Sequence, residues 1–307
     1  MTVVAIFGPT AIGKTALAIE LADRLRRSGE APPVAVSADA LQVYEGLGTL
    51  TGAATAEERR ALEHQLIGFV PVTKTFSVGE FMPPAHREID AALAEGRRPI
   101  VVGGTGLYLR AALCDLDLAP PLADQVREHW ESELSARGPT ALYEELRERA
   151  PDAAAGIDPH DSSRVVRTLA LVEAGIAPER SGESKLWSEE VRRPTLLVGL
   201  TMEREALRER VEQRVEAIVA AGAEEEVRRA DAAGASRTAR AALGFEELLS
   251  GDVEALKRRT RQYARRQLTW MRKLPGILTL DAGAHGPSAI AERIEARLEE
   301  LEASPQD

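Results

Sequence analysis

The stretch Val3-Val-Ala-Ile-Phe7 lies near the N-terminus and is followed at once by Gly8-Pro-Thr-Ala-Ile-Gly-Lys-Thr15. The first stretch is short, apolar and rich in β-branched residues, which predicts a buried strand. The second matches the pattern G-x-x-x-x-G-K-[ST], and good helix formers follow it over residues 16–27. A strand before this pattern and a helix after it are the context that a phosphate-binding loop requires. The N-terminal stretch therefore predicts an α/β domain with an anion site at the edge of its sheet.

The loop has the chemistry of a diphosphate or triphosphate site. Its glycines let backbone N–H groups turn toward an anion, and the following helix adds the positive end of its dipole. The Lys14 ammonium neutralises phosphate oxygens, and the Thr15 hydroxyl is a ligand for magnesium. The alternative is a glycine-rich turn without a ligand. The predicted phosphate-binding residues are Gly8, Pro9, Thr10, Ala11, Ile12, Gly13, Lys14 and Thr15.

Further strands and helices alternate along the chain. We expect strands over residues 34–37, 100–102, 195–200 and 277–280. We expect helices over residues 85–95, 105–113, 204–221, 223–233, 253–274 and 288–301. Such alternation predicts a parallel sheet with right-handed crossovers, flanked by helices, as in P-loop NTPases.

One long segment breaks this alternation. Residues 120–187 are charged, helical in pattern and punctuated by proline and glycine, with no strand pattern. This predicts an all-helical subdomain inserted into the α/β domain. We expect a discontinuous catalytic core over 1–117 and 190–307, with the insertion over 118–189.

Composition excludes several classes of protein. The 307 residues are 44% hydrophobic and 29% charged, which excludes general disorder. There is no run of 18 apolar residues, so no membrane span is expected. Cys114 is the one cysteine, which excludes an internal disulfide and a cysteine-based metal site. With no secretory signal in the N-terminal residues, we expect a cytoplasmic protein, and we take it to be a monomer.

The charge is distributed unevenly. Lysine and arginine number 39 against 49 acidic residues, a net charge of −10, which taken alone argues against a nucleic-acid partner. Residues 257–273, however, hold eight basic residues and no acidic one. Arg258, Arg261, Arg265 and Arg272 share one side of the expected helix. A solvated charged face is the ordinary explanation, and a local RNA-binding surface is the alternative.

Two further motifs lie where strands of the sheet should end. Asp39 follows the expected strand 34–37, and ligands of open α/β sheets bind at that edge. Its carboxylate is a candidate general base or metal ligand, or else a helix N-cap. The strand 100–102 ends in Gly103-Gly104-Thr105, where an ordinary P-loop NTPase has an acidic residue for magnesium. Glycines there would let a flat group approach the backbone, or let a helix pack closely.

Arginine pairs occur at helical spacing in two other places. Arg210 and Arg214 are four residues apart and share a face of the expected helix 204–221. Arg164 and Arg167 share a face in the insertion, with Asp161 as the predicted N-cap.

Taken together, the motifs resemble the tRNA dimethylallyltransferase family, the isopentenyl transferases of tRNA. The resemblance rests on GPTAIGKT at 8–15, SADALQVYEG at 37–46, RRPIVVGGTGLYLRAAL at 97–113 and TRQYARRQLTWMRK at 260–273. Weaker matches are DPHDSSRVVRTL at 158–169, LRERVEQRV at 207–215 and AALGFEEL at 241–248. The blocks span nearly the whole chain in the family's order.

The resemblance implies a reaction and a site. The family transfers a dimethylallyl group from its diphosphate to the exocyclic amine of the adenosine 3′-adjacent to the anticodon, and it requires magnesium. The implied catalytic residues are Asp39 as general base and Lys14, Thr15 and Arg210 around the leaving diphosphate, with Thr15 the magnesium ligand. The implied tRNA-binding residues are Asp39, Ala40, Leu41, Gln42, Thr105, Ser163, Arg164, Val165, Val166, Arg167, Arg261 and Arg265. The insertion is expected to hold the anticodon stem.

The sequence also departs from the family pattern. Residues 46–58 lack the Lys-Pro that usually follows the Gly-Thr pair, and His64-Gln65 replaces a His-His pair. Gly68 and Glu246 stand where the family favours acidic and basic residues respectively. These departures concern the tRNA contacts more than the diphosphate site.

Three alternatives remain open from the residues. The first is a P-loop kinase of a small molecule, the second an isopentenyltransferase of free AMP or ATP, and the third an RNA-binding protein without activity. The basic stretch and the insertion favour tRNA over a small acceptor. The intact Lys14, Thr15, Asp39 and Arg210 argue against an inactive protein.

Overall fold

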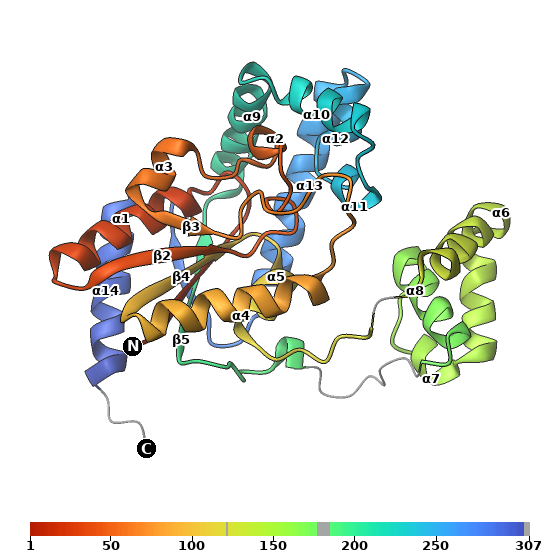
Figure 1. The fold of residues 1–307 in the computed structure, drawn as a ribbon, viewed down its shortest axis with the longest axis horizontal. Helices are drawn as coiled ribbons and strands as arrows, with labels where there is room; N and C mark the ends of the chain where they lie inside the picture. Colours follow the sequence, from red (N-terminus) through yellow and green to blue (C-terminus); the bar gives the residue numbers. More distant parts are fainter. Residues whose placement is uncertain (121, 177–184, 304–307) are drawn as a thin grey trace. The chain divides into compact units, whose positions relative to one another are not determined.

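The structure, a computed structural model, describes residues 1–120, 122–176 and 185–303. The chain divides into two compact units (Figure 1). The larger comprises Met1–Asp115 and Glu189–Asp307, and the smaller comprises Leu116–Ser188.

A six-stranded parallel sheet forms the centre of the larger unit. Its strands are β1 (Val3–Phe7), β2 (Ala31–Ser37), β3 (Glu63–Gln65), β4 (Arg97–Gly103), β5 (Thr195–Thr201) and β6 (Leu278–Asp281). Their order is β3-β2-β4-β1-β5-β6, and all neighbouring pairs run parallel. The predicted parallel α/β sheet is therefore confirmed. Every residue of β1 is fully buried, which explains its unbroken apolar sequence.

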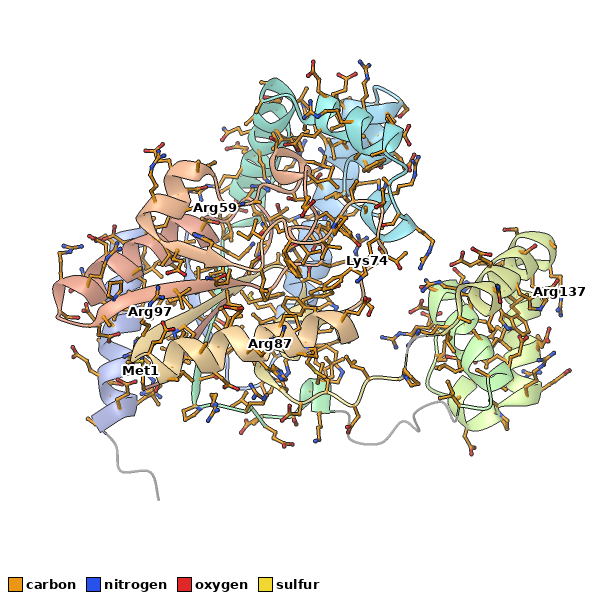
Figure 2. The ribbon with its side chains drawn as sticks, viewed as in Figure 1. Met1, Arg59, Lys74, Arg87, Arg97 and Arg137 are labelled. Carbon is orange, nitrogen blue, oxygen red and sulfur yellow. The ribbon has the colours of Figure 1, made fainter. Side chains whose placement is uncertain are left out.

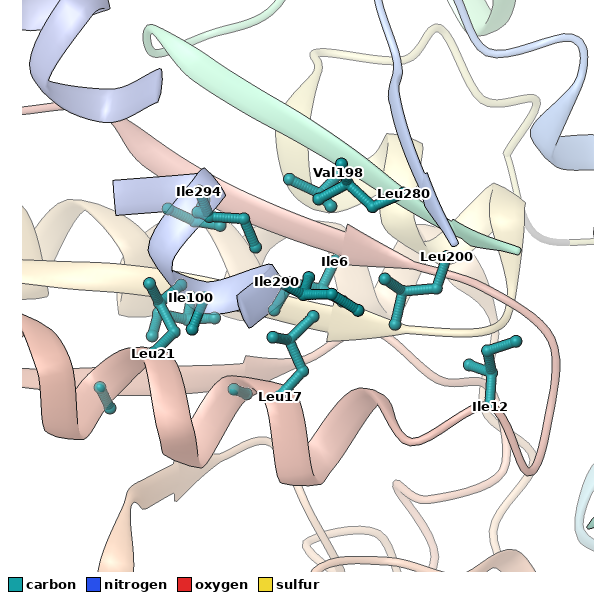
Figure 3. Close-up of a cluster of buried hydrophobic side chains, with 14 of the residues drawn as sticks. Ile6, Ile12, Leu17, Leu21, Ile100, Val198, Leu200, Leu280, Ile290 and Ile294 are labelled. Carbon is teal, nitrogen blue, oxygen red and sulfur yellow. The ribbon is translucent and has the colours of Figure 1, made fainter. Parts of the chain in front are cut away.

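Helices cover both faces of the sheet. On one face, α1 (Lys14–Arg27) and α14 (Pro287–Ala303) pack against each other and against alternate strand residues. Figure 3 shows this core, in which Leu17 and Ile290 lie against Ile6 and Leu200. On the other face, α4 (Val78–Ala94) and α5 (Gly106–Leu113) pack against β4 (Figure 1).

Several sequence-based boundaries were wrong, and two of them lie near consecutive prolines. The strand predicted over 34–37 begins at Ala31, and its register with β4 shifts between Ala31 and Val34, where two prolines lack the N–H for pairing. The helix predicted over 85–95 begins at Val78. A capping box between Ser77 and Glu80 starts it, and the helix continues through both of its prolines.

Short elements between β2 and α4 were not predicted. These are α2 (Gly48–Thr51), α3 (Ala56–Ala61) and the three-residue strand β3. Elements this short carry too few residues for a periodic pattern. Figure 2 shows Arg59 on α3, whose guanidinium binds the carbonyl of Ala54 at 2.9 Å.

Five helices lie between β5 and β6 in the sequence. They are α9 (Arg204–Ala220), α10 (Ala223–Ala232), α11 (Arg237–Arg240), α12 (Phe245–Leu249) and α13 (Val253–Met271). Helix α13 packs on α5, α9 and α12 and contains the basic stretch 257–273 as far as Met271.

The regular structure of the smaller unit, over its described residues, is helical. It contains α6 (Asp124–Arg149), α7 (Pro151–Ala154), α8 (Ser162–Glu173) and a 3₁₀ turn at Lys185–Trp187. Trp130, Leu142, Leu146 and Leu169 belong to its own hydrophobic core. The Asp161 carboxylate accepts the N–H of Arg164 at 3.1 Å, which confirms the predicted cap of α8.

The two connections to the smaller unit lie side by side on the larger one. The Arg192 N–H donates to the Leu113 carbonyl at 2.8 Å, and the Cys114 thiol donates to the Glu190 carbonyl at 3.1 Å. The described part of the chain contains no helix with the length and apolar character to cross a membrane.

Candidate functional site

A cavity of about 690 Å³ opens at the carboxyl ends of the strands. It is bounded by the glycine-rich loop, the segment after β2, the end of α2, and one face each of α9 and α13. Of the residues predicted from the sequence, its wall includes Thr10, Ala11, Gly13, Lys14, Thr15, Asp39, Leu41, Gln42 and Arg210. The structure therefore brings the predicted loop, carboxylate and arginine into one cavity, as expected for the ligand-binding edge of an open α/β sheet.

The glycine-rich loop has the backbone of an anion cradle. Gly13 has φ of 100° and precedes Lys14, the first residue of α1, and Ala11 also has a positive φ of 65°. The Lys14 ammonium donates to the carbonyls of Gly8 at 2.9 Å and Pro9 at 3.0 Å. Burial lowers the pKa of Lys14 to about 8, although the nearby Asp39 carboxylate raises it. A desolvated cation beside free loop amides favours an anionic ligand.

Asp39 lies two residues beyond the end of β2, partly buried. Its Oδ1 accepts the N–H of Leu41 at 3.0 Å, so the carboxylate caps its own turn rather than a helix. It also acts electrostatically on Lys14, Arg214 and Tyr263. The Asp39 carboxylate thus lines the cavity close to its cationic groups.

Two arginines of α9 line the cavity, and sequence reasoning chose only one of them. Arg210 is exposed, and its Nη1 reaches the carbonyl of Ile12 at 3.4 Å. Arg214, one turn later, lies deeper, with its Nη2 donating to the carbonyl of Thr51 at 3.1 Å. Burial lowers the pKa of Arg214, although Asp39 raises it. The four-residue spacing indicated a shared face but not which arginine lies deeper.

The cavity has more positive than negative charge. Lys14 and Arg214 are both desolvated, and Asp39 is the carboxylate that acts on both. Buried cations without matching carboxylates are costly unless a ligand supplies the anion. The charge balance therefore indicates a site for an anion such as a diphosphate.

The Gly103–Gly106 segment packs against protein rather than exposing a flat surface. A side-chain carbon at Gly103 would overlap Ala38, one at Gly104 would overlap Gln267, and one at Gly106 would overlap Trp270. Of the two alternatives for Gly103 and Gly104, the structure therefore favours close packing over room for a flat ligand group. Gly103 packs against the segment after β2, whereas Gly104 and Gly106 pack against side chains of α13.

Gln267 and Tyr263 of α13 were missed from the sequence. Gln267 is buried; its Oε1 accepts the Thr10 N–H at 2.8 Å, and its Nε2 donates to the Gly104 carbonyl at 2.8 Å. The Tyr263 hydroxyl lies 3.4 Å from the Thr105 Oγ1, and burial raises the pKa of Tyr263. Both line the cavity. Their spacing of four residues indicates a shared helix face, but the neighbouring arginines directed attention to the charged face of this helix.

Part of the cavity wall is apolar. It is formed by side chains from α2, α9 and α13 and from the segments after β2, β3 and α11, namely Leu41, Leu50, Ile67, Val215, Ile218, Leu243 and Leu256. One cavity thus combines a cationic end with a surface suited to a short hydrocarbon chain.

The residues predicted to contact tRNA in the insertion divide into two groups. Ser163, Arg164 and Arg167 are exposed on α8. Val165 and Val166 are buried in the core of the smaller unit, so the exposed side chains of this predicted segment are those of Ser163, Arg164 and Arg167. Because α8 is amphipathic, the two valines lie on its buried face, whereas the serine and the two arginines lie on its exposed face.

The basic face of α13 is partly neutralised by other elements. Arg261 pairs with Glu212 at 2.8 Å and Lys257 with Glu216 at 2.8 Å, both acids lying on α9. Arg259 pairs with Glu247 of α12. Residues 257–273 contain no acidic residue, but the fold brings acidic side chains of α9 and α12 against them. Arg265 remains exposed, with no ion pair among the described residues.

Comparisons with known proteins agree with this site. The family model described as IPP transferase matches residues 42–274, and the one described as isopentenyl transferase matches residues 1–72. A tRNA dimethylallyltransferase of Kineococcus radiotolerans is 39% identical over 303 residues, which cover 95% of this chain and 94% of that protein. One from Frankia alni is 41% identical over 286 residues, covering 89% and 95% respectively.

Solved structures extend the comparison. The tRNA isopentenylpyrophosphate transferase of Bacillus halodurans has a TM-score of 0.69 and 32% identity, and the match covers 97% of each chain. A eukaryotic dimethylallyltransferase acting on tRNA has a TM-score of 0.78 at 24% identity, covering 99% of this chain and 80% of that one, which shows the shared fold.

A parallel sheet with a phosphate-binding loop, a strand-end carboxylate and a cationic cavity with an apolar wall defines a P-loop-like transferase. The matched family model spans most of the chain, and the relatives above are similar over nearly their full length. The chain belongs to the IPP transferase family.

Proposed function

We propose that this chain transfers a dimethylallyl group from dimethylallyl diphosphate to the exocyclic amine of the adenosine 3′-adjacent to the anticodon of tRNA. The observation that carries the proposal is one cavity lined by Lys14 and Arg214, by several apolar side chains and by Asp39, whose carboxylate acts electrostatically on both cations. A prenyl diphosphate needs one cationic end and one apolar end, and an amine acceptor needs a base nearby.

The loop would bind the leaving diphosphate. Displacement at the allylic carbon forms a C–N bond, breaks the C–O bond and leaves negative charge on the bridging oxygen. The Lys14 ammonium and the loop N–H groups would stabilise that charge where it develops. Arg210 and Arg214 of α9 line the same cavity, and Arg210 reaches the Ile12 carbonyl of the loop.

Magnesium is expected with the diphosphate. Among the described residues, no three His, Cys, Asp or Glu side chains form a cluster that could hold a metal ion. Mg²⁺ in phosphate sites commonly has one or two protein ligands, with phosphate oxygens and water completing its shell. The Thr15 hydroxyl, which lines the cavity at the start of α1, suits that arrangement. The ion would add neutralising charge at the diphosphate.

Asp39 would accept the proton of the attacking amine. The amine of adenine is a poor nucleophile, so a base in position and good alignment contribute much of the rate. Ala40 donates its N–H to the Thr105 hydroxyl at 3.3 Å, and Gln42 accepts from Ser37 at 2.9 Å, so the segment beside Asp39 is held in place. Access requires the adenosine to leave the anticodon-loop stack.

The tRNA would contact exposed cations in both units. Arg164 and Arg167 are exposed on α8, and Arg265 on α13. Phosphate contacts of this kind give affinity that falls steeply with salt. On this proposal the insertion binds the anticodon stem, and the protein acts in the cytoplasm as a monomer.

The test compares three possible acceptors of the prenyl group. The protein is incubated with labelled dimethylallyl diphosphate and magnesium, and with unmodified tRNA, AMP or ATP as the acceptor. Label in tRNA alone is the expected result. Label in AMP or ATP instead would identify a free-nucleotide isopentenyltransferase, and phosphate transfer from ATP without prenyl transfer would identify a kinase.

A further inference from the structure

The turn that ends α2 has an unusual relation to Arg214. Gly52 has φ of 59° and ψ of 46°, in the left-handed region, directly after the last residue of α2. A side-chain carbon at this position would overlap the Nη2 of Arg214 and lie 2.6 Å from its Cζ. The guanidinium thus occupies the space that any other residue at 52 would fill.

The same turn binds two side chains of the cavity through its carbonyls. Thr51 accepts the Arg214 Nη2 at 3.1 Å, and Gly52 accepts the Gln42 Nε2 at 3.3 Å. The turn is fixed from outside the cavity, because the Glu226 carboxylate of α10 accepts the N–H groups of Thr49 at 3.0 Å and Leu50 at 2.9 Å. The position of Arg214 therefore depends on a turn that is held in place and on the absence of a side chain at Gly52.

Most hydrogen-bonding capacity of Arg214 is unused. A guanidinium has five N–H donors, and within the described part of the chain Arg214 has one hydrogen-bond partner, the Thr51 carbonyl. It is also desolvated, as the lowered pKa reflects. A partly buried guanidinium that lines the cavity and has donors beyond the one bonded to Thr51 suits a phosphate oxygen.

We propose that Gly52 is a positioning residue for the donor diphosphate: its lack of a side chain lets the Arg214 guanidinium seat against Thr51 and face the anion end of the cavity. This rests on the proposed function for the identity of the anion. It also gives a role to one residue of the segment 46–58, which departs from the family pattern. A proline at 52 would be excluded by the positive φ, and a side chain there would require the guanidinium to move.

The experiment compares two glycine substitutions of matched backbone strain. Gly52→Ala introduces both a left-handed alanine and the overlap with Arg214. Gly276→Ala is the control, because Gly276 has φ of 63° with nothing within 4 Å of an added carbon. The readouts are calorimetric affinity for inorganic diphosphate with magnesium, KM and kcat for dimethylallyl diphosphate, and melting temperature.

Gly52→Ala should weaken diphosphate binding and raise the KM for the donor by roughly tenfold, with kcat changed less and the melting temperature lowered as in Gly276→Ala. In an Arg214→Lys background, which removes the overlapping Nη2, Gly52→Ala should add less than about threefold. This double variant also serves if Gly52→Ala alone folds poorly.

Equal diphosphate affinity in the two alanine variants would overturn the inference, as would a full additional loss in the Arg214→Lys background. The outcome is separable from that of the proposed function. If the unaltered protein binds diphosphate but transfers no prenyl group to RNA, the proposed function fails, while the diphosphate titration still decides the role of Gly52.

Discussion

At the residue scale, the cavity depends on a few groups in unusual environments. Lys14 and Arg214 are cations with lowered pKa values, and Asp39 is the carboxylate they share. The sequence motif predicted Lys14 directly, because the phosphate-binding pattern specifies that lysine by position. It could not predict Arg214 over Arg210, because which of two arginines on one helix face is buried depends on where α2 ends.

Replacing Asp39 by alanine should lower kcat by about 10²–10⁴-fold, since the base for the amine proton is removed. Affinity for tRNA should stay nearly the same, because phosphate contacts elsewhere dominate it. Single-turnover kinetics and a filter-binding titration measure the two quantities. An equal loss of binding and turnover would make Asp39 a recognition residue instead.

Diphosphate affinity should depend on pH through Lys14. Burial lowers the pKa of Lys14 to about 8 in the empty site, so the ammonium that attracts the anion is present below pH 8 and lost above it. Affinity should then fall about tenfold for each pH unit above 8, because binding must restore the proton. Calorimetry of inorganic diphosphate with magnesium between pH 7 and 9.5 measures this. A flat profile would show that the Lys14 ammonium does not bind the anion.

At the element scale, α13 contributes both to the cavity and to the proposed tRNA-binding surface. Its inner face holds Gln267 between the Thr10 N–H and the Gly104 carbonyl, and its outer face carries Arg265. The sequence predicted the helix and its outer charges from spacing. It did not predict Gln267, because a buried glutamine is recognised only when both of its partners, on distant loops, are known. The strand β3 was missed for the related reason that three residues give no periodic signal.

The outer arginines of α13 should differ in their effect on tRNA binding. Arg265→Ala should weaken binding and reduce the slope of log affinity against log salt by about one, because one phosphate contact is lost. Arg261→Ala is the matched control, since its guanidinium is already paired with Glu212 at 2.8 Å, and it should change the slope less. Titrations at several salt concentrations measure both. Identical salt slopes for the two variants and the unaltered chain would show that the arginines of α13 form a solvated charged face and do not contact tRNA.

At the scale of the whole molecule, the chain ends are tied to the sheet by one buried cation. Arg98, at the start of β4, is 3% exposed and binds Glu30 at 2.7 Å, Glu302 at 3.0 Å and the Thr2 carbonyl at 2.7 Å. This joins β4, the N-terminal strand and the last helix, α14. The alternation of strands and helices predicted the sheet and the insertion. It could not predict this cluster, which connects residues almost 300 positions apart.

The Arg98 cluster should make stability sensitive to acid. Partial burial alone would raise the pKa of Glu302, but hydrogen bonds from Arg98 and Thr2 lower this pKa from 4.5 to about 2. Because the folded-state pKa is lowered, the stabilisation is complete above pH 4.5 and is lost as pH falls toward 2. Glu302→Gln should lower the melting temperature at pH 7 and make it fall less steeply with acid over this range. An unchanged acid profile would exclude a role for this carboxylate.

The central claim is that the cavity holds a prenyl diphosphate while Asp39 activates an adenosine amine of tRNA. The most direct measurement is mass spectrometry of nucleosides from unmodified tRNA after incubation with the protein, magnesium and dimethylallyl diphosphate. The account predicts one adenosine, 3′-adjacent to the anticodon, heavier by a dimethylallyl group, with release of diphosphate. Consumption of a nucleoside triphosphate in the same cavity, with every adenosine of the tRNA unchanged, would contradict it.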